Sequence, residues 1–268
     1  MEVSTFNIAS AVRKSALQMV HRAKASHIGS ALSIVDILAV LYGKVMNYNS
    51  ADHFDQNRDR FVLSKGHACV AVYATLAEVG FFGHDQLLTY GQDFSWLMNH
   101  ISHKVPGVEF STGALGHGLP FGVGKALSAK RRKESWKTYV LVGDGEMDEG
   151  SNWEALIFAA HHSLNNLVLI IDCNNLQSLT TVSDTLNLEP LSEKLLAFGW
   201  DAVEVDGHNH DQLIDALMNK LGEKPLAIIA RTIKGKGISF MENKVEWHYK
   251  NPNNEELNKA LNELESIN

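Results

Sequence analysis

Cysteine is almost absent from this chain of 268 residues, which contains only Cys69 and Cys173. The two lie far apart and within apolar runs, which favours reduced, packed thiols over a disulfide or a metal-binding pair. Proline is also scarce, with five examples, and no stretch rich in glycine, serine or proline divides the chain. We therefore expect a single domain over residues 1–268, with a C-terminal tail at roughly 251–268.

The chain also lacks a surplus of positive charge and a long apolar run. Its formal net charge of −7 argues against nucleic acid or an anionic membrane as its main partner. No segment approaches 18 uninterrupted apolar residues, and the N-terminal residues do not resemble a leader. These absences predict a cytoplasmic protein that binds neither nucleic acid nor membrane. An anionic ligand would then need a local positive site, such as a metal ion.

Hydrophobic periodicity indicates how the chain is organised. Helices are predicted at about 5–22, 31–46, 67–79, 117–131, 151–163 and 210–221. Short apolar strands are predicted at 60–63, 138–142, 167–171, 202–205 and 226–230. Because apolar strands alternate with helices, we expect an α/β fold with a mainly parallel sheet and helices on both faces.

Polar loops follow two neighbouring strands of this predicted sheet, at 143–150 and 172–177. Ligands of open parallel sheets bind beyond the carboxyl ends of the strands. Mg²⁺ prefers oxygen ligands, which Asp144, Asn174 and the backbone carbonyl of Leu176 can supply. A lone Gly-Asp-Gly is usually a turn, but its pairing with an Asn-Asn loop at the same sheet edge favours a metal and diphosphate site.

Several blocks resemble transketolase and occur in that family's order: Ser26-His27-Ile28-Gly29, Asp59 to His67, Pro106 to Glu109, Ser111 to Gly116 and Gly143-Asp144-Gly145. The similarity extends to about Lys250 and corresponds to the family's N-terminal, diphosphate-binding domain. The Gly-Asp-Gly and Asn-Asn pair is similar to the thiamine diphosphate signature. The resemblance implies this cofactor held through Mg²⁺, with Ca²⁺ or Mn²⁺ as substitutes.

The resemblance also implies roles for individual residues. Catalytic roles fall to His27, His67, His248, His100, Glu149 and Glu154. Cofactor contacts fall to His67, Gly113, Leu115, His117, Gly143, Asp144, Gly145, Glu146, Asn174 and His248. Metal ligands are Asp144, Asn174 and Leu176.

Some of these assignments have alternatives. The match weakens at 99–104, so either His100 or His103 could contact substrate. His117 could approach the cofactor or cap the following helix, whereas Glu149 and Glu154 could relay protons at a subunit interface or favour the helix dipole.

The family's pyrimidine-binding domain, which carries the glutamate that activates the cofactor, has no counterpart in these blocks. The resemblance therefore implies one subunit of a split transketolase, active with a C-terminal partner subunit in an α2β2 assembly. Such an enzyme transfers a two-carbon ketol unit from a ketose phosphate to an aldose phosphate. A synthase of the 1-deoxyxylulose-5-phosphate or dihydroxyacetone type, or a cofactor-binding homologue without catalysis, stays open as an alternative.

Overall fold

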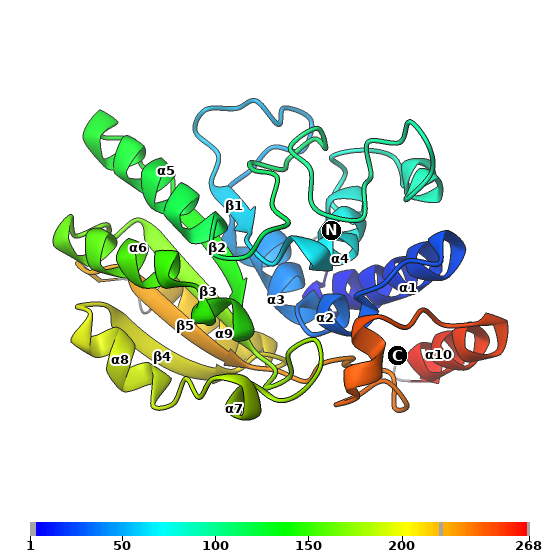
Figure 1. The fold of residues 1–268 in the computed structure, drawn as a ribbon. Coiled ribbons are helices and arrows are strands. Elements are labelled where there is room, and N and C mark those ends of the chain that lie inside the picture. Colours follow the sequence, from blue (N-terminus) through cyan, green and yellow to red (C-terminus); the bar gives the residue numbers. More distant parts are fainter. Residues whose placement is uncertain (1–3, 220–221, 267–268) are drawn as a thin grey trace.

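In a computed structural model that describes residues 4–219 and 222–266, a five-stranded sheet forms the centre of the molecule (Figure 1). Its strands are β1 (Arg60–Leu63), β2 (Thr138–Gly143), β3 (Leu167–Cys173), β4 (Asp201–Asp206) and β5 (Leu226–Arg231). They lie in the order β1-β2-β3-β5-β4, and every neighbouring pair is parallel. The predicted strands and their parallel arrangement are confirmed.

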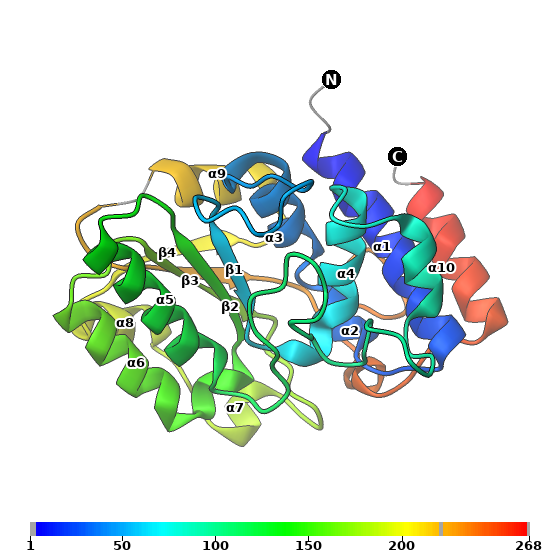
Figure 2. The same cartoon turned by 90° about the horizontal axis from the view of Figure 1, so that it is seen from above.

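Helices cover both faces of the sheet, as predicted (Figure 2). One face carries α1 (Thr5–Ala23), α2 (Ile28–Leu32), α3 (Val35–Val40), α4 (Cys69–Glu78) and α9 (His210–Asn219). The other carries α5 (Gly118–Arg132), α6 (Gly150–His161) and α8 (Leu191–Ala197). Successive strand residues alternate between the two apolar cores: Ile170 packs in the first and Ile171 in the second. This alternation explains why the central strands β2, β3 and β5 are mainly apolar.

The predicted continuous helix at 31–46 is wrong in one respect, because the chain forms α2, α3 and a π-helical turn, η1 (Leu41–Val45). The break falls at Ser33, whose Oγ lies 3.0 Å from the Ser30 carbonyl oxygen and 2.7 Å from Asp172 Oδ2 at the end of β3. A helical span over Ile28–Val45 is long and apolar enough to cross a membrane. However, 83% of it is buried inside the protein, as expected for a core helix.

Several shorter elements were not predicted. They are η2 (Gly66–Ala68), η3 (His84–Thr89), η4 (Gly145–Asp148), α7 (Val182–Thr185), α8 and η5 (Val245–His248). Helix α9 matches the predicted helix at 210–221, whose last two residues lie outside the described residues. Both cysteines are free and buried, which confirms the packed thiols.

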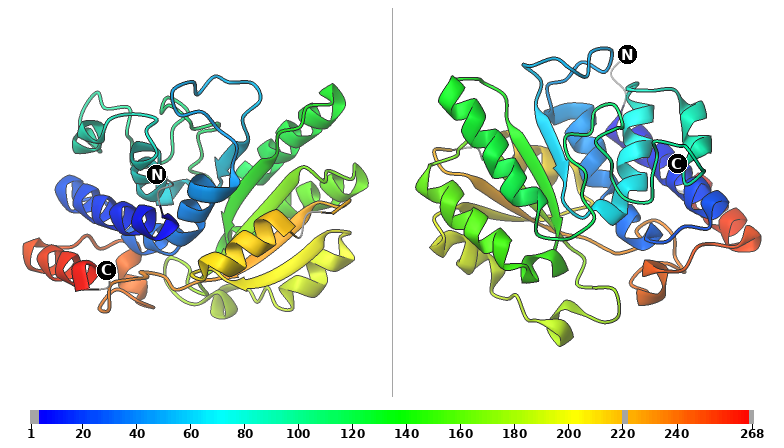
Figure 3. Two further views of the ribbon diagram at one scale, coloured as in Figure 1. Left: turned by 180° about the vertical axis from the view of Figure 1, so that it is seen from behind. Right: turned by 45° about the horizontal axis from the view of Figure 1, so that its top comes forward.

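The C-terminal tail that the sequence predicts at roughly 251–268 contains a helix. Helix α10 (Asn254–Ser266) packs on α1 and buries Ala260 and Leu264, whereas residues 267–268 lie outside the described part. Figure 3 shows the two helices side by side from two directions. This helix therefore belongs to the core packing.

The loops after β2 and β3 meet at one edge of the sheet. Gly143 and Asp172 are register partners at the ends of these strands. Just beyond them, the Asn175 backbone N–H donates to Asp144 Oδ2 over 2.7 Å. The predicted convergence of these two polar loops is confirmed.

Candidate functional site

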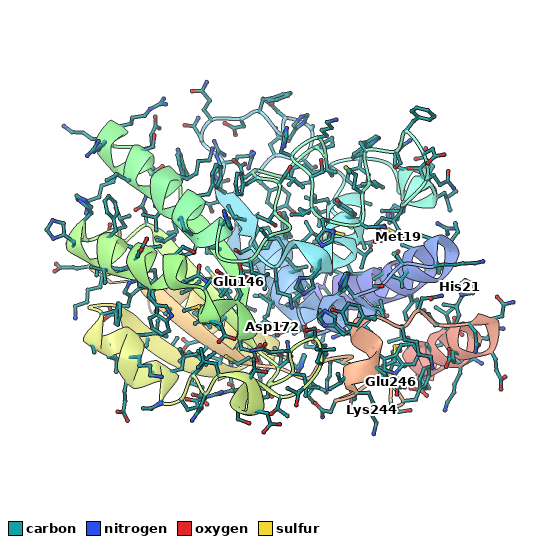
Figure 4. The ribbon with its side chains drawn as sticks, in the orientation of Figure 1. Met19, His21, Glu146, Asp172, Lys244 and Glu246 are labelled. Atoms are coloured by element: carbon teal, nitrogen blue, oxygen red, sulfur yellow. The ribbon has the colours of Figure 1, made fainter. Side chains whose placement is uncertain are left out.

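A cavity of about 280 Å³ lies at the edge where these loops meet. It is lined by His27, Ser30, Lys65, His67, His100, Gly113, Leu115, Gly143, Asp144, Gly145, Glu146, Asn174, Leu176, Gln177, Ser178, His248 and Tyr249. Glu146 and Asp172, which are labelled in Figure 4, mark the ends of β2 and β3 near the middle of the molecule. The cavity therefore lies beyond the carboxyl ends of the central strands, as expected for a parallel sheet.

Four histidines meet on one side of the cavity, although they come from distant parts of the chain. The ring centre of His27 lies 5.1 Å from that of His67, 5.8 Å from that of His100 and 5.1 Å from that of His248. His27 precedes α2 in a left-handed conformation (φ 74°), and its N–H donates to the His248 carbonyl oxygen over 2.8 Å. The resemblance predicted this group, and the structure brings all four together.

These imidazoles lie in an environment that disfavours positive charge. Burial, assisted by His100 and two nearby lysines, lowers the pKa of His27 to about 4. Burial and Lys234 lower the pKa of His248 to about 3. Burial also lowers the pKa of His67 well below its ordinary value. At neutral pH these rings are therefore uncharged and can each offer one donor and one acceptor.

The opposite side of the cavity presents oxygen ligands. Asp144 is buried, and its two carboxylate oxygens accept hydrogen bonds from the N–H groups of Gly145 and Asn175. Burial, and next the nearby Asp172 carboxylate, raise the pKa of Asp144 to about 6. A bound cation would relieve both effects, because it stabilises the ionised carboxylate. Asn174 and Leu176 line the same cavity, and their amide and carbonyl oxygens accept from the Leu176 N–H and from Lys234 Nζ.

This donor set fits Mg²⁺ better than a softer metal. Among residues 4–219 and 222–266, no group of three or more His, Cys, Asp or Glu side chains could hold a metal ion. One carboxylate with amide and carbonyl oxygens suits a hard ion that completes its shell with phosphate oxygens and water. The cavity could thus hold a metal bridged to a phosphorylated ligand.

Two buried lysines lie at this cavity, and neither was assigned from the sequence: Lys65 lines it, and Lys234 contacts three residues that line it. Lys65 is 2% exposed and Lys234 is 1% exposed. Lys234 Nζ donates to the carbonyl oxygens of Leu176 and Gln177 over 3.1 and 2.9 Å and lies 3.1 Å from His248 Nδ1. Burial, and then the Lys65 ammonium, lower the pKa of Lys234 to about 8. Buried ammonium groups beside oxygen ligands suit an anionic group such as a diphosphate.

Asp172 anchors this arrangement from below the cavity. It is fully buried, and its Oδ2 accepts from Lys65 Nζ (2.5 Å), Ser33 Oγ (2.7 Å) and Asn174 Nδ2 (2.9 Å). Thr232 Oγ1 donates to the other oxygen. Burial alone would raise the pKa of Asp172, but Lys65 and these donors hold it below its ordinary value. The ionised carboxylate thereby fixes the orientation of both Lys65 and Asn174.

Glu146 lines the cavity but is already occupied by the protein. Its Oε1 accepts from the Ser64 hydroxyl and from the Gly116 N–H over 2.9 Å, and its Oε2 accepts from the Gly143 N–H over 3.3 Å. The N–H groups of Gly143 and Gly145 bond to the chain's own carboxylates, so the glycine turn does not present them to a ligand. Glu146 instead joins the loop at 113–118 to the loop after β2.

Other predicted site residues lie outside the cavity lining. His117 is exposed at the start of α5, where its Nδ1 lies 2.8 Å from the Leu115 carbonyl oxygen. Glu149 and Glu154 are exposed at the start and on the surface of α6. His103 is also exposed, with its Nδ1 2.7 Å from Ser111 Oγ. Of the two histidines left open, the structure therefore brings His100 into the cavity.

Three of the residues missed from the sequence share one property, which is burial of a polar group. Ser30, Lys65 and Lys234 all reach the cavity or its oxygen-lined wall and are almost fully buried. Lys65 lies within the Ser-Lys-Gly-His block, and Lys234 directly precedes the Gly-Lys-Gly loop. Their position in these blocks was the available signal, whereas their burial depends on the fold.

Comparison with known proteins places these features in one family. The family described as "Transketolase, thiamine diphosphate binding domain" matches residues 4–265. The chain is 41% identical over 267 residues to an apulose-4-phosphate transketolase subunit of Phocaeicola vulgatus, covering 98% of this chain and 95% of that protein. It is 37% identical to the 6-deoxy-6-sulfo-D-fructose transketolase subunit SqwG of a Clostridium species, covering 96% and 94%.

Longer proteins match over part of their length. The chain is 40% identical to human transketolase over 243 residues, which is 39% of that protein. The crystal structure of transketolase from Campylobacter jejuni superposes with a TM-score of 0.92 at 31% identity, over 99% of this chain and 43% of that one. The chain thus spans less than half of these transketolases. With its sheet, its cavity and these relatives in agreement, the chain belongs to the transketolase family, as a thiamine diphosphate binding domain.

Proposed function

We propose that this chain is one subunit of a two-subunit transketolase, which transfers a two-carbon ketol unit from a ketose phosphate to an aldose phosphate. The observation that carries the proposal is the meeting of three kinds of group in one cavity. Histidines and residues with oxygen ligands line it, and two buried ammonium groups lie beside them. A site that only bound a cofactor's phosphates would not need four histidines beside them.

Holding the cofactor falls to the oxygen-lined side. Asp144, Asn174 and the Leu176 carbonyl would bind Mg²⁺, or Ca²⁺ or Mn²⁺ in its place. Lys65 and Lys234 would neutralise the remaining phosphate charge. Thiamine diphosphate, when bound, supplies the electron sink that carbon–carbon bond cleavage and formation need.

The histidines would act on the sugar. Because burial keeps His27, His67 and His248 uncharged, each can donate to a hydroxyl or carbonyl oxygen without adding positive charge beside the lysines. His100, whose ring faces His27 edge-on, completes the group. Such groups orient the ketose and exchange protons with its hydroxyls, which is general acid–base work.

The proposed partner is a C-terminal transketolase subunit that supplies the pyrimidine-binding domain and the activating glutamate in an α2β2 assembly. Support comes from the relatives that are themselves named as single transketolase subunits, which this chain matches over nearly their whole length. Glu149 and Glu154 are exposed near the start of α6, so a second chain could cover them. We further propose that the enzyme works on sugar phosphates in the cytoplasm.

Co-purification with the product of the neighbouring gene tests the catalytic proposal. With thiamine diphosphate and Mg²⁺, the pair should transfer ketol units between sugar phosphates, and either chain alone should be inactive. The panel should include ordinary pentose phosphates and branched sugars. A pair that binds cofactor but condenses pyruvate with an aldose phosphate would point to the synthase alternative. A pair that binds cofactor and does neither would contradict catalysis.

A separate experiment tests the metal assignment. Asp144→Ala should abolish Mg²⁺-dependent binding of thiamine diphosphate measured by calorimetry, since it removes the one carboxylate of the donor set. Asp85→Ala, which removes an exposed carboxylate outside the cavity, is the matched control and should bind as the unmodified chain does. Unchanged binding by the Asp144 variant would refute the metal site.

A further inference from the structure

The segment that carries Lys234 is held closely by the protein around it. The Gly235 N–H donates to the Gly29 carbonyl oxygen over 3.0 Å, and Gly235 has a φ of 83°. A Cβ at Gly235 would lie 2.4 Å from the Met241 carbonyl oxygen, and one at Gly29 would lie 3.2 Å from Lys234 Cγ. The Lys234 side chain therefore lies in a narrow space beside α2, and the position of its ammonium group depends on the position of its backbone.

A buried charge cluster lies behind this segment, outside the cavity. Asp36 of α3 accepts from Arg13 Nη2 over 2.5 Å, and its oxygens lie 2.7 Å from His208 Nδ1 and 3.2 Å from His210 Nε2. Burial opposes ionisation, but the hydrogen bonds of both histidines and the Arg13 charge hold the pKa of Asp36 well below its ordinary value. Asp36 is therefore a permanent acceptor for the groups around it.

The contacts of His208 determine which of its nitrogens carries the proton. The Ile233 N–H donates to His208 Nε2 over 2.9 Å, so Nε2 must present a lone pair. Nδ1 then carries the hydrogen and donates it to Asp36 Oδ2. A carboxylate that fixes the tautomer and orientation of a histidine in this way determines what the other nitrogen can bind. Here the group that it binds is the backbone next to Lys234.

A second contact from the same cluster holds the other end of the segment. Arg13 donates through Nε to the Lys236 carbonyl oxygen over 3.3 Å, while its Nη2 is bonded to Asp36. The segment from 233 to 236 is thus clamped on both sides of Lys234 by groups that converge on one carboxylate.

We infer that Asp36 and His208 are positioning residues that set Lys234 in the anion site. The path runs from Asp36 through the His208 ring to the Ile233 N–H, and from there to the lysine whose ammonium lies at the Leu176 and Gln177 carbonyls and His248. The inference rests on the proposed function, because it assumes that a diphosphate binds beside Lys234. Loss of comparable outer partners costs about 10- to 100-fold in affinity at metal sites.

Calorimetry with Mg²⁺ and inorganic pyrophosphate on the full chain tests the inference. In Asp36→Asn the new amide can donate to His208 Nδ1, which favours the tautomer whose Nε2–H opposes the Ile233 N–H. We expect pyrophosphate affinity to fall by about 10- to 100-fold. His210→Asn is the matched control, since His210 contacts the same carboxylate but its other nitrogen faces Thr5 Oγ1. It should leave pyrophosphate affinity unchanged even where it lowers the unfolding temperature.

A mutant cycle separates positioning from general damage. If Asp36 acts through Lys234, Asp36→Asn should cost no further affinity in a chain that already carries Lys234→Met. His208→Leu should lower pyrophosphate affinity, whereas His208→Gln, which offers a donor and an acceptor, should retain part of it. These two His208 variants test the positioning role even if Asp36→Asn does not fold.

The failure of this inference can be told from failure of the proposed function. An unmodified chain that does not bind pyrophosphate with Mg²⁺ would contradict the cofactor site itself. An unmodified chain that binds, together with an Asp36→Asn chain that binds equally well, would overturn the positioning role alone. The positioning role would also be overturned if Asp36→Asn lowered pyrophosphate affinity as much in the Lys234→Met chain as in the unmodified chain.

Discussion

The buried pair of Lys65 and Asp172 makes the sharpest prediction about stability. Lys65 Nζ lies 2.5 Å from Asp172 Oδ2, and their side chains are 2% and 0% exposed. In Lys65→Met the apolar stem is largely kept, so the main effect is a carboxylate that stays buried without its cation. Removing one member of such a pair costs about 3–5 kcal/mol. We expect a loss of that size in the free energy of unfolding.

Urea unfolding of the chain without Mg²⁺ or pyrophosphate measures this loss, because no ligand then contributes to stability. For a protein of this size, about 3–5 kcal/mol corresponds to a decrease of roughly 5–9 °C in Tm. Lys125→Met is the matched control. Lys125 also contacts a carboxylate, at 3.1 Å from Glu109, but it is 33% exposed and Glu109 keeps Arg58 and Arg60. Its loss should cost less than about 1 kcal/mol.

A double variant isolates the cause. Asp172→Asn removes the negative charge but keeps one side-chain oxygen, which can accept from Ser33 if it takes the place of Oδ2. In that background Lys65→Met should cost almost nothing or restore stability, because Asp172→Asn leaves the Lys65 ammonium buried without its carboxylate and the second change removes that charge. If Lys65→Met is equally costly in both backgrounds, or costs less than the Lys125 control, then an uncompensated carboxylate is not the source of the effect.

Two further predictions concern packing and pH. Gly122→Ala should destabilise the chain by about 1–3 kcal/mol, because its Cβ would lie 2.3 Å from Val140 Cγ2. Gly124→Ala on the same helix should instead stabilise the chain by about 0.5–1 kcal/mol, because its Cβ would meet no neighbouring group within 4 Å. Urea unfolding measures both changes. The folded pKa values of about 4 for His27 and about 3 for His248 lie below the unfolded value near 6.5, so the unfolded chain binds more protons and stability should fall as pH falls from about 6.5 towards 4. His27→Asn should flatten this slope between pH 7.5 and 5.0, and an identical slope would contradict the lowered pKa.

The fold was largely predictable because its signal is local. The central strands β2, β3 and β5 are short and mainly apolar, and such runs alternating with helices are typical of a parallel sheet covered on both faces. The helix predicted at 31–46 shows where this reasoning stops. Its break at Ser33 depends on the Asp172 carboxylate, which lies far along the chain. Periodicity carries no information about such a contact.

The same distinction applies to the site. Asp144 and Asn174 could be predicted because each directly follows a strand, and parallel strands end at one edge. Lys234 also follows a strand of this edge, because β5 ends at Arg231 and pairs with β3, but its buried path past α2 depends on the folded chain. Lysines are rarely buried, so sequence alone gives no reason to place one inside. The signal that identifies it is burial, which exists only after folding.

The charges of the cavity argue that its metal and its anion bind together. None of the ion pairs found among the described residues includes Lys234 or Asp144. Their pKa values are displaced towards the neutral forms, down to about 8 and up to about 6. A diphosphate alone would compensate the lysine and leave the carboxylate uncovered, and Mg²⁺ alone would do the reverse. Each ligand should therefore raise the affinity for the other by the same factor, which calorimetric titration of pyrophosphate at several Mg²⁺ concentrations measures. Independent affinities would contradict a shared site.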